Sequence, residues 1–282
     1  MGDLFVCATP IGNLSDISGR ALEILKNADL VACEDTRVSL GLMNAYGISS
    51  KLVSYHKFNE ESKSETLVGE LLAGKNIALI TDAGTPCISD PGSILVKKAI
   101  DAGVRVFGIP GACAAITALS VSGFGGGTFA FYGFLPRKKS ETDGLFAEIR
   151  KSDVKNHIFY ESPLRVRESL KLFAAAFPDD MLCAANDLTK KFERTLVGTS
   201  SEVYARLAED EKAEKGEYVL ILHYEREAKT QEEISPEAAI FDRIIKGANL
   251  KEAVEAVSDK YSRNSLYAAK LRLEKLLNGT IK

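Results

Sequence analysis

The stretch that organises this sequence reads Asp82-Ala-Gly-Thr-Pro-Cys-Ile-Ser-Asp-Pro-Gly92. It follows Ile77–Ile80, a short apolar run rich in residues that favour β-strands, and an apolar helical pattern resumes at Ile94. Two glycines and two prolines interrupt the stretch, and two acids and two hydroxyl side chains accompany them. Because open α/β sheets bind ligands beyond the carboxyl ends of their strands, we expect this loop to line a binding site. An ordinary turn between a strand and a helix is the alternative.

Strand and helix patterns alternate through the first half of the chain. Strands are expected at residues 4–8, 30–33, 51–54, 77–80 and 104–109. Helices are expected to end near residues 28, 47, 73 and 102, and the first of them to be capped by Ser15 or Asp16. This alternation predicts a parallel sheet with helices on both faces, in an α/β domain of residues 1–121.

A glycine-rich segment at 122–127 is the expected linker to a second α/β domain at 128–225. In that domain, strands are expected at residues 129–134, 157–160, 181–185 and 218–223, with a hairpin at 191–197. The last strand is expected at the edge of its sheet. Helices are expected to end near residues 150, 177 and 208, the second of them with Val166, Leu170, Phe173 and Phe177 on one face.

The remaining chain predicts a small helical appendage. The charged segment 225–233 is expected to be a linker, and three helices are expected at residues 236–246, 250–257 and 262–277. Two short helices in succession resemble a helix-turn-helix unit within an appendage of residues 232–282. The last helix is expected to have one apolar face, formed by Leu266, Ala269, Leu273, Leu276 and Leu277.

Composition limits the partners of the chain. The net charge is −3, so contact with nucleic acid would depend on local patches; residues 260–282 carry six Lys or Arg against one Glu. No apolar stretch is long enough to cross a membrane, and no signal peptide precedes the first strand. Five scattered cysteines without a C-x-x-C pair favour a reduced, cytoplasmic protein with neither a disulfide framework nor a zinc site.

Motifs of common enzyme classes are missing from the strand ends. The loop after the first strand is Thr9-Pro-Ile-Gly-Asn13 rather than G-x-G-x-x-G, and neither a P-loop nor a G-x-S-x-G motif occurs. Short polar loops instead follow the strands, at residues 10–13, 34–37, 55–60, 82–92 and 110–115. In a doubly wound sheet these loops converge on one crevice, which suits a neutral or zwitterionic cofactor.

Several of these blocks, taken in order, resemble a known family. They are Thr9–Leu14, Glu34–Arg37, Asp82–Gly92, Pro110–Ala112, Gly133–Lys138, Tyr160–Pro163, Leu188–Lys190 and Gly216–Val219. They look like the signature blocks of the tetrapyrrole methylase superfamily and, within it, of the branch that methylates small-subunit ribosomal RNA. The resemblance extends over roughly residues 4–224, and the C-terminal helices resemble that branch's appendage less closely.

The resemblance implies two α/β domains with S-adenosyl-L-methionine bound between them. It also implies a homodimer that does not associate with a membrane. It implies methyl transfer to the ribose 2′-hydroxyl of a cytidine in the decoding centre of 16S rRNA, as bare RNA or in the small ribosomal subunit. Two other functions remain open at this point. One is methylation of a porphyrin or corrin precursor, and the other is a non-catalytic RNA-binding role in ribosome assembly.

Carried over block by block, the resemblance implies a set of cofactor-binding residues. They are Pro10, Asp82, Gly84, Thr85, Pro86, Ile88, Ser89, Pro110, Gly111, Ala112, Cys113, Ala114, Tyr160, Leu188 and Thr189. The stretch at 110–114 would hold the methionine or ribose end through backbone groups at a helix start. For each residue, packing in a loop or a hydrophobic wall is the alternative.

Transfer to a hydroxyl group is helped by a base or a polarising cation. Asp35 and His56 are the candidate bases, and Arg37 is the candidate electrostatic partner or phosphate clamp. A salt-bridged Asp35–Arg37 helix cap is the alternative. Candidate RNA contacts are Arg137, Lys138, Lys139, Lys190 and Lys191, each of which would otherwise be a solvated surface residue.

The chain departs from the pattern of the branch at two positions. Phe58 stands where a second histidine is usual, in Tyr55-His-Lys-Phe-Asn-Glu60. Asn186 stands where an arginine is usual, ahead of Leu188-Thr-Lys190. The first departure weakens any mechanism that needs a pair of histidines, and the second removes a cation near the expected cofactor wall.

Overall fold

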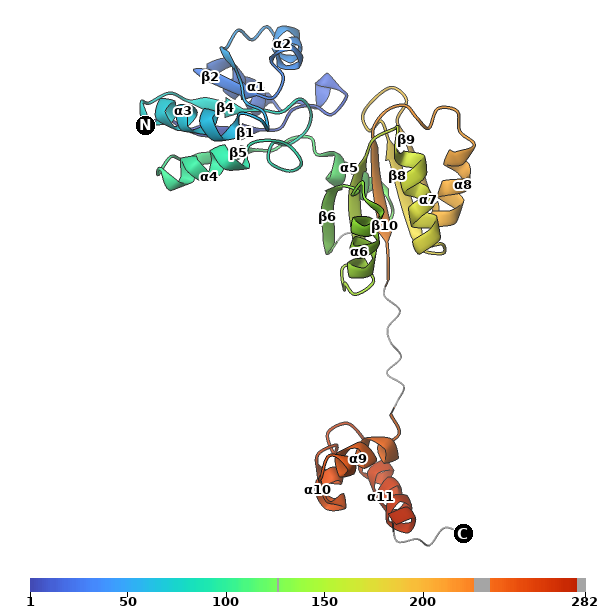
Figure 1. The fold of residues 1–282 in the computed structure, drawn as a ribbon. Coiled ribbons are helices and arrows are strands. Elements are labelled where there is room, and N and C mark those ends of the chain that lie inside the picture. The colour runs from blue at the N-terminus through green and yellow to red at the C-terminus, as the bar shows by residue number, and fades with distance from the viewer. Residues whose placement is uncertain (126, 226–233, 278–282) are drawn as a thin grey trace. The chain divides into compact units, whose positions relative to one another are not determined.

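The computed structural model describes residues 1–125, 127–225 and 234–277. The chain divides into two compact units, Met1–Glu225 and Arg226–Lys282 (Figure 1). The linker expected at 225–233 lies almost entirely outside the described residues, and the linker expected at 122–127 includes one residue that lies outside them.

The first sheet of the larger unit has five parallel strands in the order β3-β2-β4-β1-β5. They are β1 (Leu4–Cys7), β2 (Leu30–Cys33), β3 (Leu52–Ser54), β4 (Ile77–Leu79) and β5 (Val106–Ile109). The expected parallel sheet is therefore confirmed. Since β1 and β4 are neighbours, the loops after them begin side by side at the carboxyl edge of the sheet.

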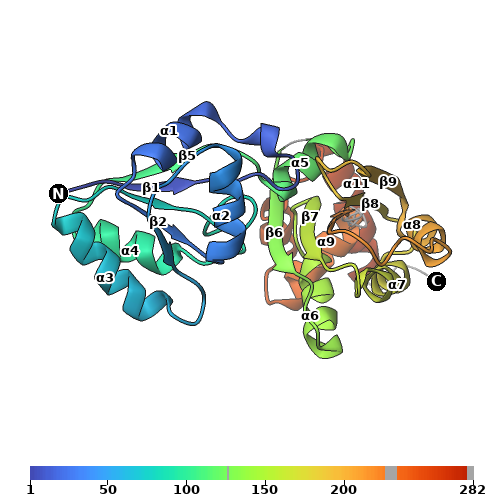
Figure 2. The same cartoon turned by 90° about the horizontal axis from the view of Figure 1, so that it is seen from above.

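Two pairs of helices cover the two faces of this sheet (Figure 2). On one face pack α1 (Gly19–Asn27) and α2 (Thr36–Ala45), and on the other α3 (Glu60–Leu72) and α4 (Ser93–Asp101). Ser15 and Asp16 do not cap α1, contrary to the prediction. They belong to a short 3-10 helix (η1, Leu14–Asp16), and Ser18 caps α1 by accepting a hydrogen bond from the backbone amide of Ala21 at 3.2 Å.

The second sheet is mixed, with the order β6-β7-β10-β8-β9. Its strands are β6 (Phe129–Phe134), β7 (Asn156–Glu161), β8 (Met181–Asn186), β9 (Arg194–Thr199) and β10 (Tyr218–His223). The prediction that β10 lies at an edge is wrong, because β10 pairs antiparallel with both β7 and β8. Its first five residues are buried, as expected of a central strand. The hairpin predicted at 191–197 is also displaced, since β9 pairs with β8 across a loop at 187–193.

Helices cover both faces of the second sheet. On one face pack α6 (Lys139–Ile149), α7 (Val166–Ala176) and α8 (Ser200–Ala208), around Phe159, Leu220 and their neighbours. On the opposite face packs α5 (Ala114–Val121), whose Ala115 and Ala118 contact Ile158 and Ile221. The chain thus reaches the second sheet before α5, upstream of the expected linker. The domain boundaries at 121 and 128 stay a prediction.

The smaller unit contains α9 (Pro236–Ile245), α10 (Leu250–Glu255) and α11 (Arg263–Leu277). Its core joins Ile240, Ala253 and Leu273, together with other buried residues of the three helices. Leu266, Ala269 and Leu273 are buried as predicted, whereas Leu276 is 60% exposed. The prediction that Leu276 shares the apolar face is therefore wrong, and the side chain of Leu277 lies outside the described residues.

Candidate functional site

The loop at 82–92 is tied to the loops that follow β1 and β5. Thr9 and Gly84 form an isolated antiparallel bridge, in which the amide of Thr9 donates to the carbonyl of Gly84 at 2.8 Å and the amide of Gly84 donates back at 3.1 Å. Gly84 adopts a φ of 84°, which glycine tolerates without strain. The hydroxyl of Thr85 donates to the carbonyl of Ala112 at 3.0 Å. Three strand-end loops are thus connected into one wall.

The far end of the same loop is fixed by Gly92. Gly92 has a φ of 139°, and its amide donates to Oε1 of Glu60 at 2.9 Å. A Cβ at this position would lie 2.6 Å from Sγ of Cys87 and 2.9 Å from Cδ2 of Leu79. Only glycine fits there, so the sequence at 82–92 is matched to one compact loop conformation.

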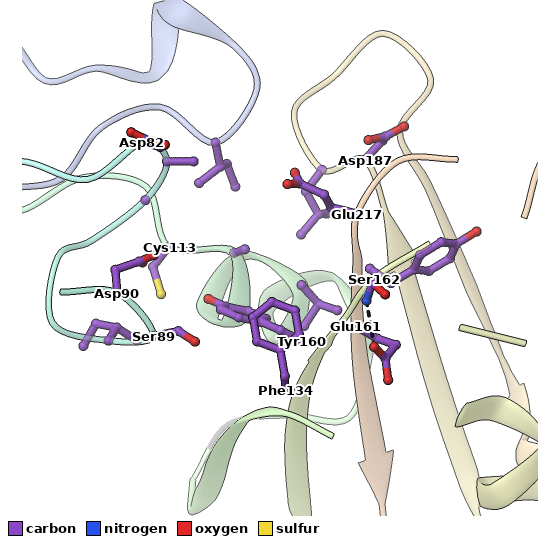
Figure 3. A pocket seen from close by; sticks show the side chains of 18 of the residues that line it. Asp82, Ser89, Asp90, Cys113, Phe134, Tyr160, Glu161, Ser162, Asp187 and Glu217 are labelled. Carbon is purple, nitrogen blue, oxygen red and sulfur yellow. Dashed lines mark hydrogen bonds between the residues drawn. The ribbon is translucent and has the colours of Figure 1, made fainter. Parts of the chain in front are cut away.

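A cavity of about 380 Å³ lies between this wall and the second sheet (Figure 3). Asp82, Ser89 and Asp90 line one side of it, and Phe134, Tyr160 and Glu217 line the other. Nine of the predicted cofactor residues line it, and they are Asp82, Gly84, Thr85, Ile88, Ser89, Cys113, Ala114, Tyr160 and Leu188. The structure therefore gathers residues from both halves of the larger unit around one space.

Six predicted cofactor residues do not line the cavity. They are Pro10, Pro86, Pro110, Gly111, Ala112 and Thr189. Three of them, Gly111, Ala112 and Thr189, make contacts within the loops instead. A Cβ at Gly111 would lie 2.8 Å from Cβ of Ala8, and the carbonyl of Ala112 accepts the bond from Thr85. The amide of Thr189 donates to Oε2 of Glu193 at 2.6 Å.

The prediction from sequence omitted a further set of residues that line the cavity. They are Ile11, Ala83, Asp90, Phe134, Glu161, Ser162, Pro163, Asp187, Glu217, Tyr218 and Val219, and Lys190 joins them although it was assigned to RNA. Three of these belong to the start of β10 or the residue before it. Placing β10 in the centre of its sheet would have identified them, because that end of β10 meets the end of β7.

The wall from the second sheet consists of a buried tyrosine ring and a loop held by ion pairs. Burial raises the pKa of Tyr160 to about 12, and the ring of Tyr160 packs edge-on against Phe131 with centroids 4.8 Å apart. Nζ of Lys190 lies 2.9 Å from Asp187 and 2.9 Å from Glu217. Asp187 and Thr189 both have positive φ angles, of 51° and 66°. Strained backbone at two non-glycine residues is typical of a site where the structure fixes a loop for a ligand.

A second cavity, of about 440 Å³, adjoins the loop after β2. It is lined by Glu34, Asp35, Thr36, Ser54, His56, Lys57, Phe58 and Asp82. Among the described residues, Asp82 alone lines both cavities. Burial, and then the charges of Asp82 and Asp90, raise the pKa of Glu34. Burial and the charge of Asp82 likewise raise the pKa of Asp90.

Asp35 and Arg37, two of the candidate catalytic residues, form an ion pair. Asp35 caps α2 by accepting from the amide of Arg37 at 2.8 Å, and it accepts from Nε and Nη2 of the same residue at 3.1 and 2.6 Å. The hydrogen bonds from Arg37 lower the pKa of Asp35 to about 2. The capped ion pair expected as the alternative is thus present, and a carboxylate of such low pKa is a weak base.

The third candidate, His56, has an assignable proton. Its backbone amide donates to Oδ1 of Asn59 at 2.8 Å, which identifies the other amide atom of Asn59 as nitrogen. That Nδ2 lies 3.4 Å from Nε2 of His56. Because an amide nitrogen only donates, the neutral ring carries its proton on Nδ1. Nδ1 is buried and has no partner within the described part of the chain.

The candidate RNA-binding cations differ in their surroundings. Lys138 pairs with Glu141 at 3.1 Å and Lys139 with Asp143 at 2.7 Å, both on exposed surface. Lys191 is exposed and lies 5.6 Å from the ring centroid of Phe192. Arg137 is exposed as well. Lys190 is neutralised by two carboxylates, which makes it a component of the cavity wall rather than a free cation.

Comparison of the sequence with known protein families identifies the class of protein to which this fold and site belong. The model of the tetrapyrrole (corrin/porphyrin) methylases matches residues 3–204. Solved structures with this fold include a diphthine synthase (TM-score 0.62, 17% identity, covering 79% of this chain and 90% of that one). A uroporphyrin-III C-methyltransferase from Thermus thermophilus, complexed with S-adenosyl homocysteine, has a TM-score of 0.54 at 18% identity, covering 79% and 97%. These likenesses show the fold alone.

Curated relatives are much more similar to this chain. A ribosomal RNA small subunit methyltransferase I from Haemophilus influenzae is 42% identical over 94% of this chain and 95% of its own length. The protein of that name from Bacillus subtilis is 40% identical over 95% and 94%. The chain belongs to the tetrapyrrole methylase family and, within it, to the family of ribosomal RNA small subunit methyltransferase I.

None of the helices in the described ranges is both long and apolar enough to cross a membrane. Residues 1–125, 127–225 and 234–277 contain no group of three or more His, Cys, Asp or Glu placed to hold a metal ion.

Proposed function

We propose that this chain transfers a methyl group from S-adenosyl-L-methionine to the ribose 2′-hydroxyl of a cytidine in the decoding centre of 16S rRNA, cytidine 1402 in rRNA numbering. The names of the relatives support an rRNA substrate. The observation that carries the proposal is the position of Asp82, which lines both a cofactor-sized cavity and the second cavity beside it. A methyl donor and an acceptor held in these two spaces would meet at one carboxylate.

The residues of the first cavity suit the proposed cofactor. Its lining is largely apolar, with Ile11, Leu188 and Val219 available to an adenine ring and acids available to hydroxyl and amino groups. The first-turn amides of α5 would hold a carboxylate, since the N-cap residue Cys113 supplies no side-chain hydrogen bond to them. When bound, S-adenosyl-L-methionine supplies a methyl group on a positively charged sulfur.

The chain's own residues would orient the acceptor and take up its proton. Positioning supplies much of the rate of such a displacement. Asp82 Oδ1 already accepts the backbone amide of Asp35 at 3.0 Å, which fixes the carboxylate between the cavities. Its second oxygen would accept the 2′-hydroxyl proton. Asp35, paired with Arg37, would orient the acceptor rather than deprotonate it.

The test compares the wild-type chain with Asp82→Asn. Ribose methylation is mapped in 16S rRNA from cells that lack the protein, and then after incubation of their small subunits with each variant. The wild type should restore one 2′-O-methyl group, whereas Asp82→Asn should lower turnover about 100-fold or more. Cofactor affinity, measured by calorimetry, should change by less than about tenfold. Full turnover in Asp82→Asn would remove the proton-acceptor role, and an unmethylated ribose with wild type would remove the function.

Assembly and location remain proposals as well. We propose that the chain acts as a homodimer in the cytoplasm, and that the helices of residues 234–277 contribute to binding the ribosomal substrate. Sedimentation of the full chain tests the first statement. Comparing the methylation of bare 16S rRNA with that of small subunits shows which of the two is the substrate.

A further inference from the structure

An exposed aromatic ring stands beside the second cavity. The side chain of Phe58 is 94% exposed, yet it lines this cavity together with Glu34 and His56. Its ring meets the ring of His56 edge-on, with centroids 6.1 Å apart and an interplanar angle of 65°. A large ring so exposed at a cavity is a stacking surface for a flat ligand, and unstacked nucleobases are the ligands that proteins bind in this way.

The charges around the cavity favour a base over a phosphate inside it. Asp35 and Asp82 are engaged, but Glu34 has no hydrogen-bond or ion-pair partner in the described part of the chain. Its oxygens therefore remain acceptors. Cytosine offers an amino donor at the position where uracil offers a carbonyl acceptor, and Glu or Asp accepts from that amino group.

Two neighbouring groups complete the recognition. His56 supports the ring of Phe58 from the side, through the edge-on contact between the two rings. Lys57 is exposed next to Phe58 and forms no ion pair within the residues that the structure describes. A phosphate outside the acidic cavity would meet this cation at the rim.

We propose that the second cavity receives the base of the target cytidine extruded from the RNA, with Phe58 stacked on its ring and Glu34 accepting a hydrogen bond from its amino group. The inference rests on the proposed methyl transfer and adds how the target nucleotide is selected. The position of Asp82 in both cavities places the ribose of such a base beside the methyl donor's cavity.

The first experiment removes the stacking face. Phe58→Ala is compared with Phe58→His, which keeps an aromatic ring, and with Ile100→Ala, which removes another exposed apolar side chain that lines neither cavity. Base stacking on an aromatic side chain corresponds to roughly a 5- to 100-fold effect on affinity. We expect Phe58→Ala to raise KM for small subunits by that factor with unchanged cofactor affinity. Phe58→His should raise KM less than Phe58→Ala does, and Ile100→Ala should stay within about threefold of wild type.

The second experiment tests the edge contact. Glu34→Gln replaces a pure acceptor by a group that also donates, so its side-chain amide should donate a hydrogen bond to the carbonyl of uracil. Small subunits are prepared with cytidine or uridine at the target position. The wild type should prefer cytidine, and Glu34→Gln should reduce that preference roughly 10- to 100-fold. An unchanged preference would overturn the role of Glu34.

The outcomes separate this inference from the function on which it rests. If the wild type does not methylate the subunit, the proposed function fails. If the wild type methylates it and Phe58→Ala does so with unchanged KM and kcat, the stacking role is overturned while the function stands. If Phe58→Ala instead changes the sedimentation of the free protein, the ring belongs to an interface between copies of the chain, which also overturns the proposal.

Discussion

Replacing Gly92 by Ala should damage the loop at 82–92 in two separable ways. At its φ of 139° any side chain is strained, which costs about 1–3 kcal/mol. The new Cβ would also lie 2.6 Å from Sγ of Cys87 and 2.9 Å from Cδ2 of Leu79, and such overpacking costs about another 1–3 kcal/mol. The expected loss in the free energy of unfolding is thus about 2–6 kcal/mol, a large part of the usual total.

The assay is urea unfolding followed by far-ultraviolet circular dichroism, because the chain contains no Trp. Gly103→Ala is the matched control, since it has a φ of 76° but no described atom within 4 Å of its Cβ. It should lose only about 1–2 kcal/mol. In the double variant with Cys87→Ala, part of the cost of Gly92→Ala should be recovered.

Cofactor affinity gives a second reading of the same change. A loop displaced at Gly92 also displaces Ser89 and Asp90, so the dissociation constant for S-adenosyl-L-methionine should rise in Gly92→Ala and stay unchanged in Gly103→Ala. The reasoning is refuted if Gly92→Ala is no less stable than Gly103→Ala, or if it binds the cofactor as tightly as the wild type.

Three shorter predictions concern other parts of the chain. Burial lowers the pKa of His157. The free energy of unfolding should therefore decrease as the pH drops through about 6.5, where the histidine of the unfolded chain takes up a proton. Over that range the urea midpoint should fall less for His157→Gln than for the wild type. Leu220→Ala in the centre of β10 should lower the free energy of urea unfolding by about 2–5 kcal/mol, and the same substitution in an edge strand would lower it less. Deleting residues 230–282 should weaken binding of small subunits while calorimetry shows unchanged cofactor affinity, and unchanged activity on subunits would contradict this.

The sequence predicts the first sheet well because each of its strands has a recognisable local sequence pattern. Buried parallel strands are short apolar runs closed by polar loops, and β2 and β4 are of this kind. The central position of β10 in its sheet could not be predicted from such a local pattern. Its last residue, His223, and the charged segment after it suggest a strand that leaves the fold, while its pairing depends on contacts with β7 and β8 over long sequence separations.

The same limit explains which parts of the candidate site were predicted. The loop at 82–92 lies in one continuous stretch, so its composition alone predicts a binding loop, with an ordinary turn as the alternative, and the loop does line the cavity. Glu217 and Tyr218 enter the cavity only because β10 is central. Asp35 carries a strong local signal as a polar residue at a strand end, but whether it acts as a base depends on the hydrogen bonds from Arg37, which composition does not reveal.

The departure at Asn186 also has a physical consequence that differs from the expectation. The sequence suggested that a cation near the cofactor wall is lost there. Instead, Arg194 on β9 donates to Oδ1 of Asn186 at 3.0 Å and to the hydroxyl of Tyr218 at 3.0 Å, and it forms an ion pair with Asp210. Tyr218 lines the cavity. A positive charge therefore lies behind the cavity wall, supplied by the neighbouring strand β9, and Asn186 accepts one of the hydrogen bonds that hold this guanidinium.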